Sequence, residues 1–345
     1  MPYTLVLNSS NVIGSNNSIF KYNFINGSFV VNTDSEICIS QVVIPYSWFN
    51  INKTFYTNAT LQYKFPNGST NNTYTVIFPD GYYSVSDLNH YLQLYMVSQN
   101  QYFYSSTAGT NLYYIQIVTN TTYYSNQIII YNVPTVLPSG YSLPSNVING
   151  FTYTGFNCNT TTAGSVGSVS SFFPNATITP QVIIPAYTGI YGIGSIIGFS
   201  GGTYPITQQS TSYNVLSNTI PNATPVNSIV IRSDIVSNPC AMPSDILDTF
   251  SINTTFGSNI TYTPPYEKWV SIQSGTYNSI TIQFQDQNFN TLQSNDPNIL
   301  IALLLRQGST ISKPQPPPHI NRIVSPLVKQ LDFKDEKNSY KELDE

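Results

Sequence analysis

The chain of 345 residues is long enough for one large β domain with an insertion, or for two domains. Only 8% of its residues are charged, against about a quarter in an ordinary soluble domain, while 41% hydrophobic residues exclude a disordered composition. The net charge is −4, and Lys and Arg form no cluster on any predicted strand or loop. We therefore expect no direct nucleic-acid binding through the folded body.

The scarcity of charge has two explanations. A genome rich in A and T would inflate Asn, Ile and Tyr codons, but it would also inflate Lys codons, and lysines are few here. Alternatively, much of the surface is covered by partners, because interface cores lose Lys, Glu and Asp and gain Tyr and Phe. The 27 tyrosines favour this interface explanation.

Residues 1–132 predict strands separated by turns. The chain opens "MPYTLVL", without the basic and apolar regions of a secretory signal. Aromatic and polar residues alternate in "FKYNF" (Phe20–Phe24) and "LQYKF" (Leu61–Phe65), which places one set of side chains in a core. Further strands are expected at Glu36–Ile44, Tyr74–Phe78, Leu112–Val118 and Gln127–Tyr131.

One short helix is expected at about residues 84–98. Ser84 and Asp87 form a weak capping box, and an apolar stripe follows at Leu88, Tyr91, Leu92, Tyr95 and Met96. His90 points away from this stripe, with Asp80 and Asp87 nearby. An Asp–His pair supplies too few ligands for a metal, so we interpret the helix as a structural support and expect no metal site.

Between residues 133 and 225 the texture changes. Gly, Ser and Thr dominate "NTTTAGSVGSVSS" and "YGIGSIIGFSGGTYP", with short apolar runs between them. A stretch this long without structure is unusual in a compact domain, so we predict a loop-rich β domain inserted between strands.

Strands return in residues 226–308, at Ile229–Val236, Lys268–Ile272 and Ile280–Phe284. "ILIALLLR" (Ile299–Arg306) is apolar on both faces but far shorter than the roughly 20 residues that span a bilayer. It predicts a central strand buried on both sides, and no membrane insertion.

Residues 309–345 form a Pro-rich and charged tail. "KPQPPPHINR" predicts an extended spacer, and the tail carries six positive and six negative charges, so the body carries the net −4. A tail of this kind is either disordered or an arm that lies on a neighbour.

No motif of a catalytic or cofactor site stands out, and we expect neither enzymatic activity nor a cofactor. Asp245 and Asp248 in "PSDILDTF" are candidates for the two carboxylates of a glycosidase. A simpler interpretation is that Pro243-Ser244-Asp245 caps a short helical turn. Cys38, Cys158 and Cys240 are too few and too far apart for a disulfide framework or a zinc site.

Several segments together resemble the penton, or minor capsid, proteins of virophages and Polinton-like viruses. They are "NSIFKYNF", "ISQVVIPYSWFNI", "FPDGYYSVSDLNHYLQ", "SIVIRSDIV", "PSDILDTF", "SITIQFQDQNFNTL" and "NDPNILIALLLR", which span about residues 17–103 and 226–306. The insertion and the tail are not covered by this resemblance.

The resemblance implies an all-β protein: a single jelly-roll β-sandwich formed by residues 1–132 and 226–308, with the inserted domain at its outer end. It also implies a homopentamer at the icosahedral vertices, in contact with the major capsid protein, after synthesis in the host cytoplasm or a viral factory. We expect Tyr46, Trp48 and Phe49 near a sheet edge or interface, although closing the sandwich core is an equal alternative. Pro316, Pro317 and Pro318 are expected at an interface if the tail is an anchoring arm.

An alternative function is a viral attachment or lectin-like protein that binds a host receptor or glycan through the inserted domain. Aromatic platforms with Asn and Gln side chains suit carbohydrate. A double jelly roll is disfavoured, because two such barrels exceed the roughly 308 residues before the tail.

Overall fold

The structure is a computed structural model. It describes residues 2–67, 70–99, 101–105, 107, 109–133, 139–142, 178–187 and 191–307. The Pro-rich tail, with Pro316, Pro317 and Pro318, lies outside these residues, as does Cys158 in the insertion. The first compact unit of the chain is Met1–Gly308.

Two antiparallel sheets form a jelly roll. One has the strand order β1 (Tyr3–Leu7), β22 (Leu300–Arg306), β5 (Glu36–Pro45) and β18 (Asn259–Tyr262), and β19 (Val270–Ser271) also pairs with β5. The other has the order β17 (Ile246–Ser251), β16 (Ser228–Ser233), β21 (Ser279–Asp286), β3 (Ile19–Asn23) and β2 (Val12–Ile13). A two-stranded ribbon pairs β20 (Gly275–Tyr277) with β4 (Phe29–Val31), and the 3₁₀ helix η1 (Ser9–Asn11) precedes β2.

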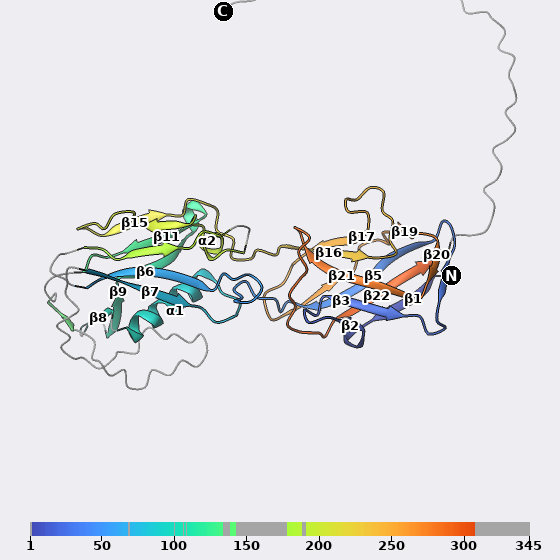
Figure 1. Ribbon diagram of the computed structural model, residues 1–345, viewed down its shortest axis with the longest axis horizontal. Helices are drawn as coiled ribbons and strands as arrows, with labels where there is room; N and C mark the ends of the chain where they lie inside the picture. The colour runs from blue at the N-terminus through green and yellow to red at the C-terminus, as the bar shows by residue number, and fades with distance from the viewer. Residues whose placement is uncertain are drawn as a thin grey trace, which may run out of the picture. The chain divides into compact units, whose positions relative to one another are not determined.

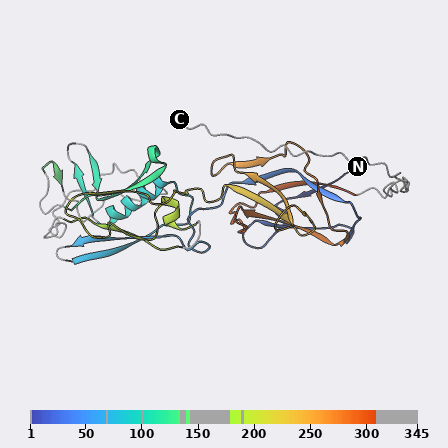
Figure 2. The ribbon, with the colours of Figure 1, turned by 90° about the horizontal axis from the view of Figure 1, so that it is seen from above.

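The topology identifies the jelly roll. When the eight main strands β1, β3, β5, β16, β17, β18, β21 and β22 are numbered one to eight, the sheets read 1-8-3-6 and 5-4-7-2. This is the strand order of an eight-stranded jelly roll. Strands from both ends of the chain therefore interleave, as the blue and orange ribbons show (Figures 1 and 2). The all-β jelly-roll fold expected from the sequence is confirmed.

The jelly-roll core lies between the two sheets and follows the period-two alternation of the sequence. Ile301 and Leu303 of β22 are buried beside Val42 and Ile39, their partners on β5. On the facing sheet, the rings of Phe20 and Phe284 meet edge to face with their centroids 5.8 Å apart. Alternate residues of each strand thus supply the core.

A second core is formed within the segment between β5 and β16. One sheet has the order β14 (Gly202–Tyr204), β13 (Gln181–Ile184), β6 (Thr60–Asn67) and β7 (Thr70–Ile77). Two further sheets have the orders β10 (Ile115–Asn120), β11 (Ser125–Ile130), β15 (Tyr213–Leu216) and β12 (Tyr141–Ser142), β8 (Tyr102–Ser105), β9 (Thr110–Tyr113). The helices are α1 (Val85–Ser98), α2 (Ile193–Ile197) and the 3₁₀ helix η2 (Thr121–Tyr123).

Helix α1 forms where the sequence predicts it. Ser84 is the N-cap, and its capping box with Asp87 is complete in both directions. Leu88, Leu92 and Met96 are buried in the second core. Helix α1 therefore packs its apolar stripe onto the strands of the insertion, whereas the five-residue α2 in the Gly-rich stretch was not predicted.

The inserted segment is longer than the sequence suggested. It begins after β5 ends at Pro45 and ends before β16 starts at Ser228, whereas the change of texture in the sequence predicts a start at residue 133. The fully buried apolar residues from Ile51 to Val133, including those of α1, belong to the second core, whereas Tyr56 and Tyr82 pack against the jelly-roll core. Periodicity identifies strands but does not show which sheet they join, and the change of texture at 133 falls within the inserted segment.

Three predicted strands are divided or shortened in the structure. Leu112–Val118 is divided into β9 and β10, because Tyr113, Tyr114 and Ile115 are buried in succession and the chain bends there. Ile229–Val236 ends as a strand at Ser233, and Lys268–Ile272 is reduced to the two-residue strand Val270–Ser271; Val236 and Ile272 form an isolated bridge with each other.

Buried polar contacts join the insertion to the jelly roll. The carboxylate of Asp286, at the end of β21, is fully buried and accepts hydrogen bonds from the hydroxyl of Tyr191 and from the backbone N–H groups of Asn288 and Asn290. Tyr191 also stacks on Tyr56, with ring centroids 4.1 Å apart. Burial, followed by the hydrogen bond to Asp286, raises the pKa of Tyr191, so its hydroxyl remains a donor.

The Tyr191→Phe variant tests this junction. It removes one donor from a buried carboxylate while keeping the ring stack, and should lower the free energy of unfolding by about 1.5–3 kcal/mol in urea denaturation. Tyr187→Phe, at a more exposed tyrosine of the same loop, should change it by less than about 0.5 kcal/mol. Equal effects of the two substitutions would contradict the role given to Tyr191.

Candidate interaction surface

The two acidic residues considered for glycoside hydrolysis are each paired with a cation. The guanidinium of Arg232 donates two hydrogen bonds to Asp245, at 2.9 Å from Nε and 2.6 Å from Nη2. Arg232 also reaches Gln285 on β21. The pair joins neighbouring strands of one sheet, which is a structural arrangement. No helical turn forms at Pro243-Ser244-Asp245; the segment runs through turns and bends into β17.

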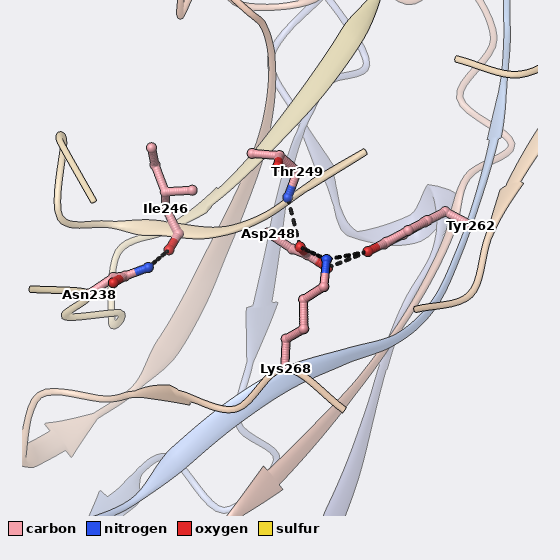
Figure 3. Close-up of polar contacts among 6 residues, drawn as sticks. All are labelled: Asn238, Ile246, Asp248, Thr249, Tyr262 and Lys268. Carbon is pink, nitrogen blue, oxygen red and sulfur yellow. Dashed lines mark hydrogen bonds and ion pairs between the residues drawn. The ribbon is translucent and has the colours of Figure 1, made fainter. Parts of the chain in front are cut away.

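Asp248 lies in a second polar cluster (Figure 3). Its carboxylate is buried and accepts hydrogen bonds from Lys268 Nζ at 3.0 Å, the Tyr262 hydroxyl at 2.8 Å and the Thr249 N–H at 2.8 Å. Burial lowers the pKa of Lys268, but its contacts with Tyr262 and Asp248 outweigh this and raise it overall. Asp248 thus has a cation and two further donors as partners, and connects β17 to the segment around β18.

The other acidic residues singled out in the sequence cap backbone groups. Asp80 accepts a hydrogen bond from the N–H of Lys53, Asp234 from the N–H of Thr281, and Asp87 from Ser84. His90 is half-buried on α1. Among the described residues, no group of three or more His, Cys, Asp or Glu side chains is placed to hold a metal ion.

The predicted interface residues Tyr46, Trp48 and Phe49 lie in an aromatic cluster. The rings of Tyr46 and Trp48 are 4.5 Å apart, and Phe256 contacts both Tyr46 and Phe49. Tyr82 stacks on Phe256 at 4.6 Å. Tyr46 and Trp48 are buried, with Trp48 only 2% exposed, so within the subunit they close the jelly-roll core; Phe49 is half-buried.

A different apolar surface is exposed on the sheet β1-β22-β5-β18, on the side opposite the core. We call it the outer face and define it by Val6, Val43, Leu300, Ala302 and Leu304. Register places these side chains in rows across the strands: Val6 is opposite Ala302, and Leu300 is opposite Val43. Val6 is 47% exposed and Leu300 38%, and the others are half-buried.

The exposure of β22 corrects the expectation that it is covered on both sides. Ile301, Leu303 and Leu305 are buried, but Leu300, Ala302 and Leu304 alternate with them on the outer face. The strand is central within its sheet, with β1 and β5 as neighbours, yet the described residues leave much of its second face open. The run of seven apolar residues in the sequence therefore indicates this surface. Burial of both faces inside the subunit was the wrong interpretation of that run.

One end of the sheet is closed by an ion pair. Arg306 contacts Glu36 at 2.5 Å, and its guanidinium lies 4.1 Å from the centre of the Trp269 ring. Beneath it, Cys38 is fully buried on β5, opposite Leu304. Burial, followed by the charge of Glu267, raises the pKa of the Cys38 thiol to about 11.

In the described part of the chain, no helix is both long enough and apolar enough to cross a membrane.

The chain matches known proteins in the comparison with solved structures. No protein-family profile matches the chain, and no curated protein matches it. The solved structure of the mavirus penton protein matches over 89% of this chain and 98% of its own, with 10% identity and a TM-score of 0.39. A chain of the Sputnik virophage structure matches over 88% of this chain and 98% of its own length, with 14% identity and a TM-score of 0.32. The chain is similar to a penton protein.

The two described cysteines should differ in reactivity. Cys240 is exposed. The raised pKa of Cys38 leaves about 100-fold less thiolate at neutral pH than an unshifted thiol would have, and burial blocks access as well. Iodoacetamide labelling followed by peptide mass spectrometry should modify Cys240 rapidly and Cys38 only after unfolding in urea. Rapid labelling of Cys38 in the native protein would contradict the closed end of the sheet.

Proposed function

We propose that the protein is a structural virion protein, a penton subunit that forms homopentamers at the icosahedral vertices. The observation that carries this proposal is the outer face: a sheet of a jelly roll that exposes Val, Ala and Leu side chains to solvent. A contiguous apolar surface of this kind marks an interaction site when it recurs along one face. The scarcity of charged residues in the whole chain supports extensive contacts.

The occupant of the outer face is another copy of this chain. A closed ring needs a heterologous contact, in which one surface meets a different surface of the next subunit. The outer face carries no charged side chain among its five defining residues, so it adds no repulsion between subunits that each carry a net charge of −4. Stable interfaces bury about 800 Å² per partner. We expect the outer face to supply part of this area and neighbouring loops to supply the rest.

The proposal also gives a role to the inserted domain and to the tail. The segment between β5 and β16 is an inserted domain that we place at the outer end of the jelly roll. Residues 309–345, with Pro316, Pro317 and Pro318, form an arm that reaches the major capsid protein beneath the vertex. We propose a role in the virion without catalysis, because Asp245 and Asp248 are paired with Arg232 and Lys268.

Substitution of Val6 by Glu tests the outer face. In a free subunit the new carboxylate stays in water, so the fold should be retained, whereas burial at an interface without a partner would cost several kcal/mol. Sedimentation velocity should therefore show loss of the oligomer. The matched control is Thr249→Glu, an exposed position on β17 of the other sheet, which adds the same charge.

The control should assemble as the unmodified chain does. Retention of the oligomer by Val6→Glu, or its loss in both variants, would contradict the outer face as the contact between copies. Circular dichroism of both variants checks that the β fold is intact.

A further inference from the structure

The inserted domain contains a cavity that the capsid role does not use. It has a volume of about 460 Å³ and lies between the start of α1 and the turn that joins β10 to β11. Small-molecule sites in proteins typically have volumes of about 300–1,000 Å³. Among the described residues, none that lines the cavity is charged. Most carry hydroxyl or amide groups, and Val85, Pro221 and Ala223 supply apolar wall.

Hydrogen-bonding groups in this cavity are left open. Val85 and Ser86, the first two residues of α1, line it, and the first N–H groups of a helix have no acceptor within the helix. The N–H of Asp87, the third, is already taken by the Ser84 hydroxyl at 3.1 Å. The hydroxyl oxygen of Ser125 is buried in the cavity wall and has no hydrogen-bond partner among the described residues.

One of the residues that line the cavity is an exposed tyrosine. Tyr124 lines the cavity and yet is 76% exposed. Its backbone is left-handed, with φ 49° and ψ 45°, a conformation that is uncommon for a bulky residue. The turn is fixed from the other side, since the Asn120 side chain caps η2 by accepting a hydrogen bond from the N–H of Tyr123.

Tyr124 is therefore kept in an unfavourable conformation without being buried. A Gly or Asn would make the same turn with less strain. Packing does not explain the tyrosine, because most of its surface is in water. Strained residues persist where the surroundings or the function require them.

We propose that this cavity binds a neutral sugar, a pyranose unit of a glycan. A pyranose has C–H groups on one face, which suit the Tyr124 ring, and hydroxyls around its edge, which suit Ser86, Ser125 and the N–H groups of the first two helix residues. Hydroxyls both donate and accept, as the lining side chains do. The absence of charge from the cavity lining disfavours phosphorylated and acidic ligands, which need cations.

The site goes beyond the capsid role and does not depend on it. It rests on the geometry of the inserted domain alone, whether the subunit assembles or not. It also gives the attachment function considered from the sequence a specific location and ligand class.

Saturation-transfer NMR on the full chain tests the site. The probes are methyl glycosides of galactose, glucose, mannose, fucose and N-acetylglucosamine, with N-acetylneuraminic acid as the acidic comparison. At least one neutral glycoside should receive magnetisation from the protein. The signal should be lost in Tyr124→Asn, which removes the ring but suits the left-handed backbone, and should decrease in Ser125→Ala.

The matched control is Tyr123→Asn, because Tyr123 is also exposed, at 67%, but does not line the cavity. This variant should bind as the unmodified chain does. The midpoint of thermal unfolding of Tyr124→Asn should be unchanged or higher, since strain is relieved; a role in packing would lower it. No signal from any neutral glycoside, a signal from the acidic sugar alone, or unchanged binding in Tyr124→Asn would overturn the proposal.

Discussion

The pairing of the last strand, β22, between β1 and β5 is the constraint on which the structure depends. It brings Leu303 of β22 beside both Leu5 near the N-terminus and Ile39 of β5, so residues from both ends of the chain complete one sheet. The inner residues of this sheet close the jelly-roll core. The same pairing sets the outer residues in rows, so the formation of the core and the exposure of an apolar outer face have a single cause.

The jelly roll also accommodates the long inserted segment between two of its strands. The chain leaves after β5 and returns at β16, having formed a core of its own on the way. Asp286 is buried and forms no ion pair with the described residues; backbone and side-chain donors satisfy it, one of which is Tyr191 from the inserted segment. A buried carboxylate requires such donors. The junction between the two cores is therefore fixed by specific hydrogen bonds.

The sequence predicts local elements well and their assembly poorly. Alternation in Ile280–Phe284 and the capping box of Ser84 each depend on residues close in the chain, and both elements form as expected. The boundary of the inserted domain could not be predicted, because the alternation of Leu61–Phe65 is the same whether that strand joins the jelly roll or a second core. Likewise, Trp48 and Leu300 are both apolar, and only the packing of the folded chain shows that the first is buried in the subunit and the second exposed.

We infer that burial of the apolar outer face between copies of the chain drives assembly. The scarcity of charged residues and the single jelly roll agree with this. The measurement that tests it most directly is the mass of the purified full chain in solution, by light scattering. The account predicts a closed pentamer of five times 38.3 kDa, or about 192 kDa. A chain that remains monomeric at 38.3 kDa at all accessible concentrations would contradict it.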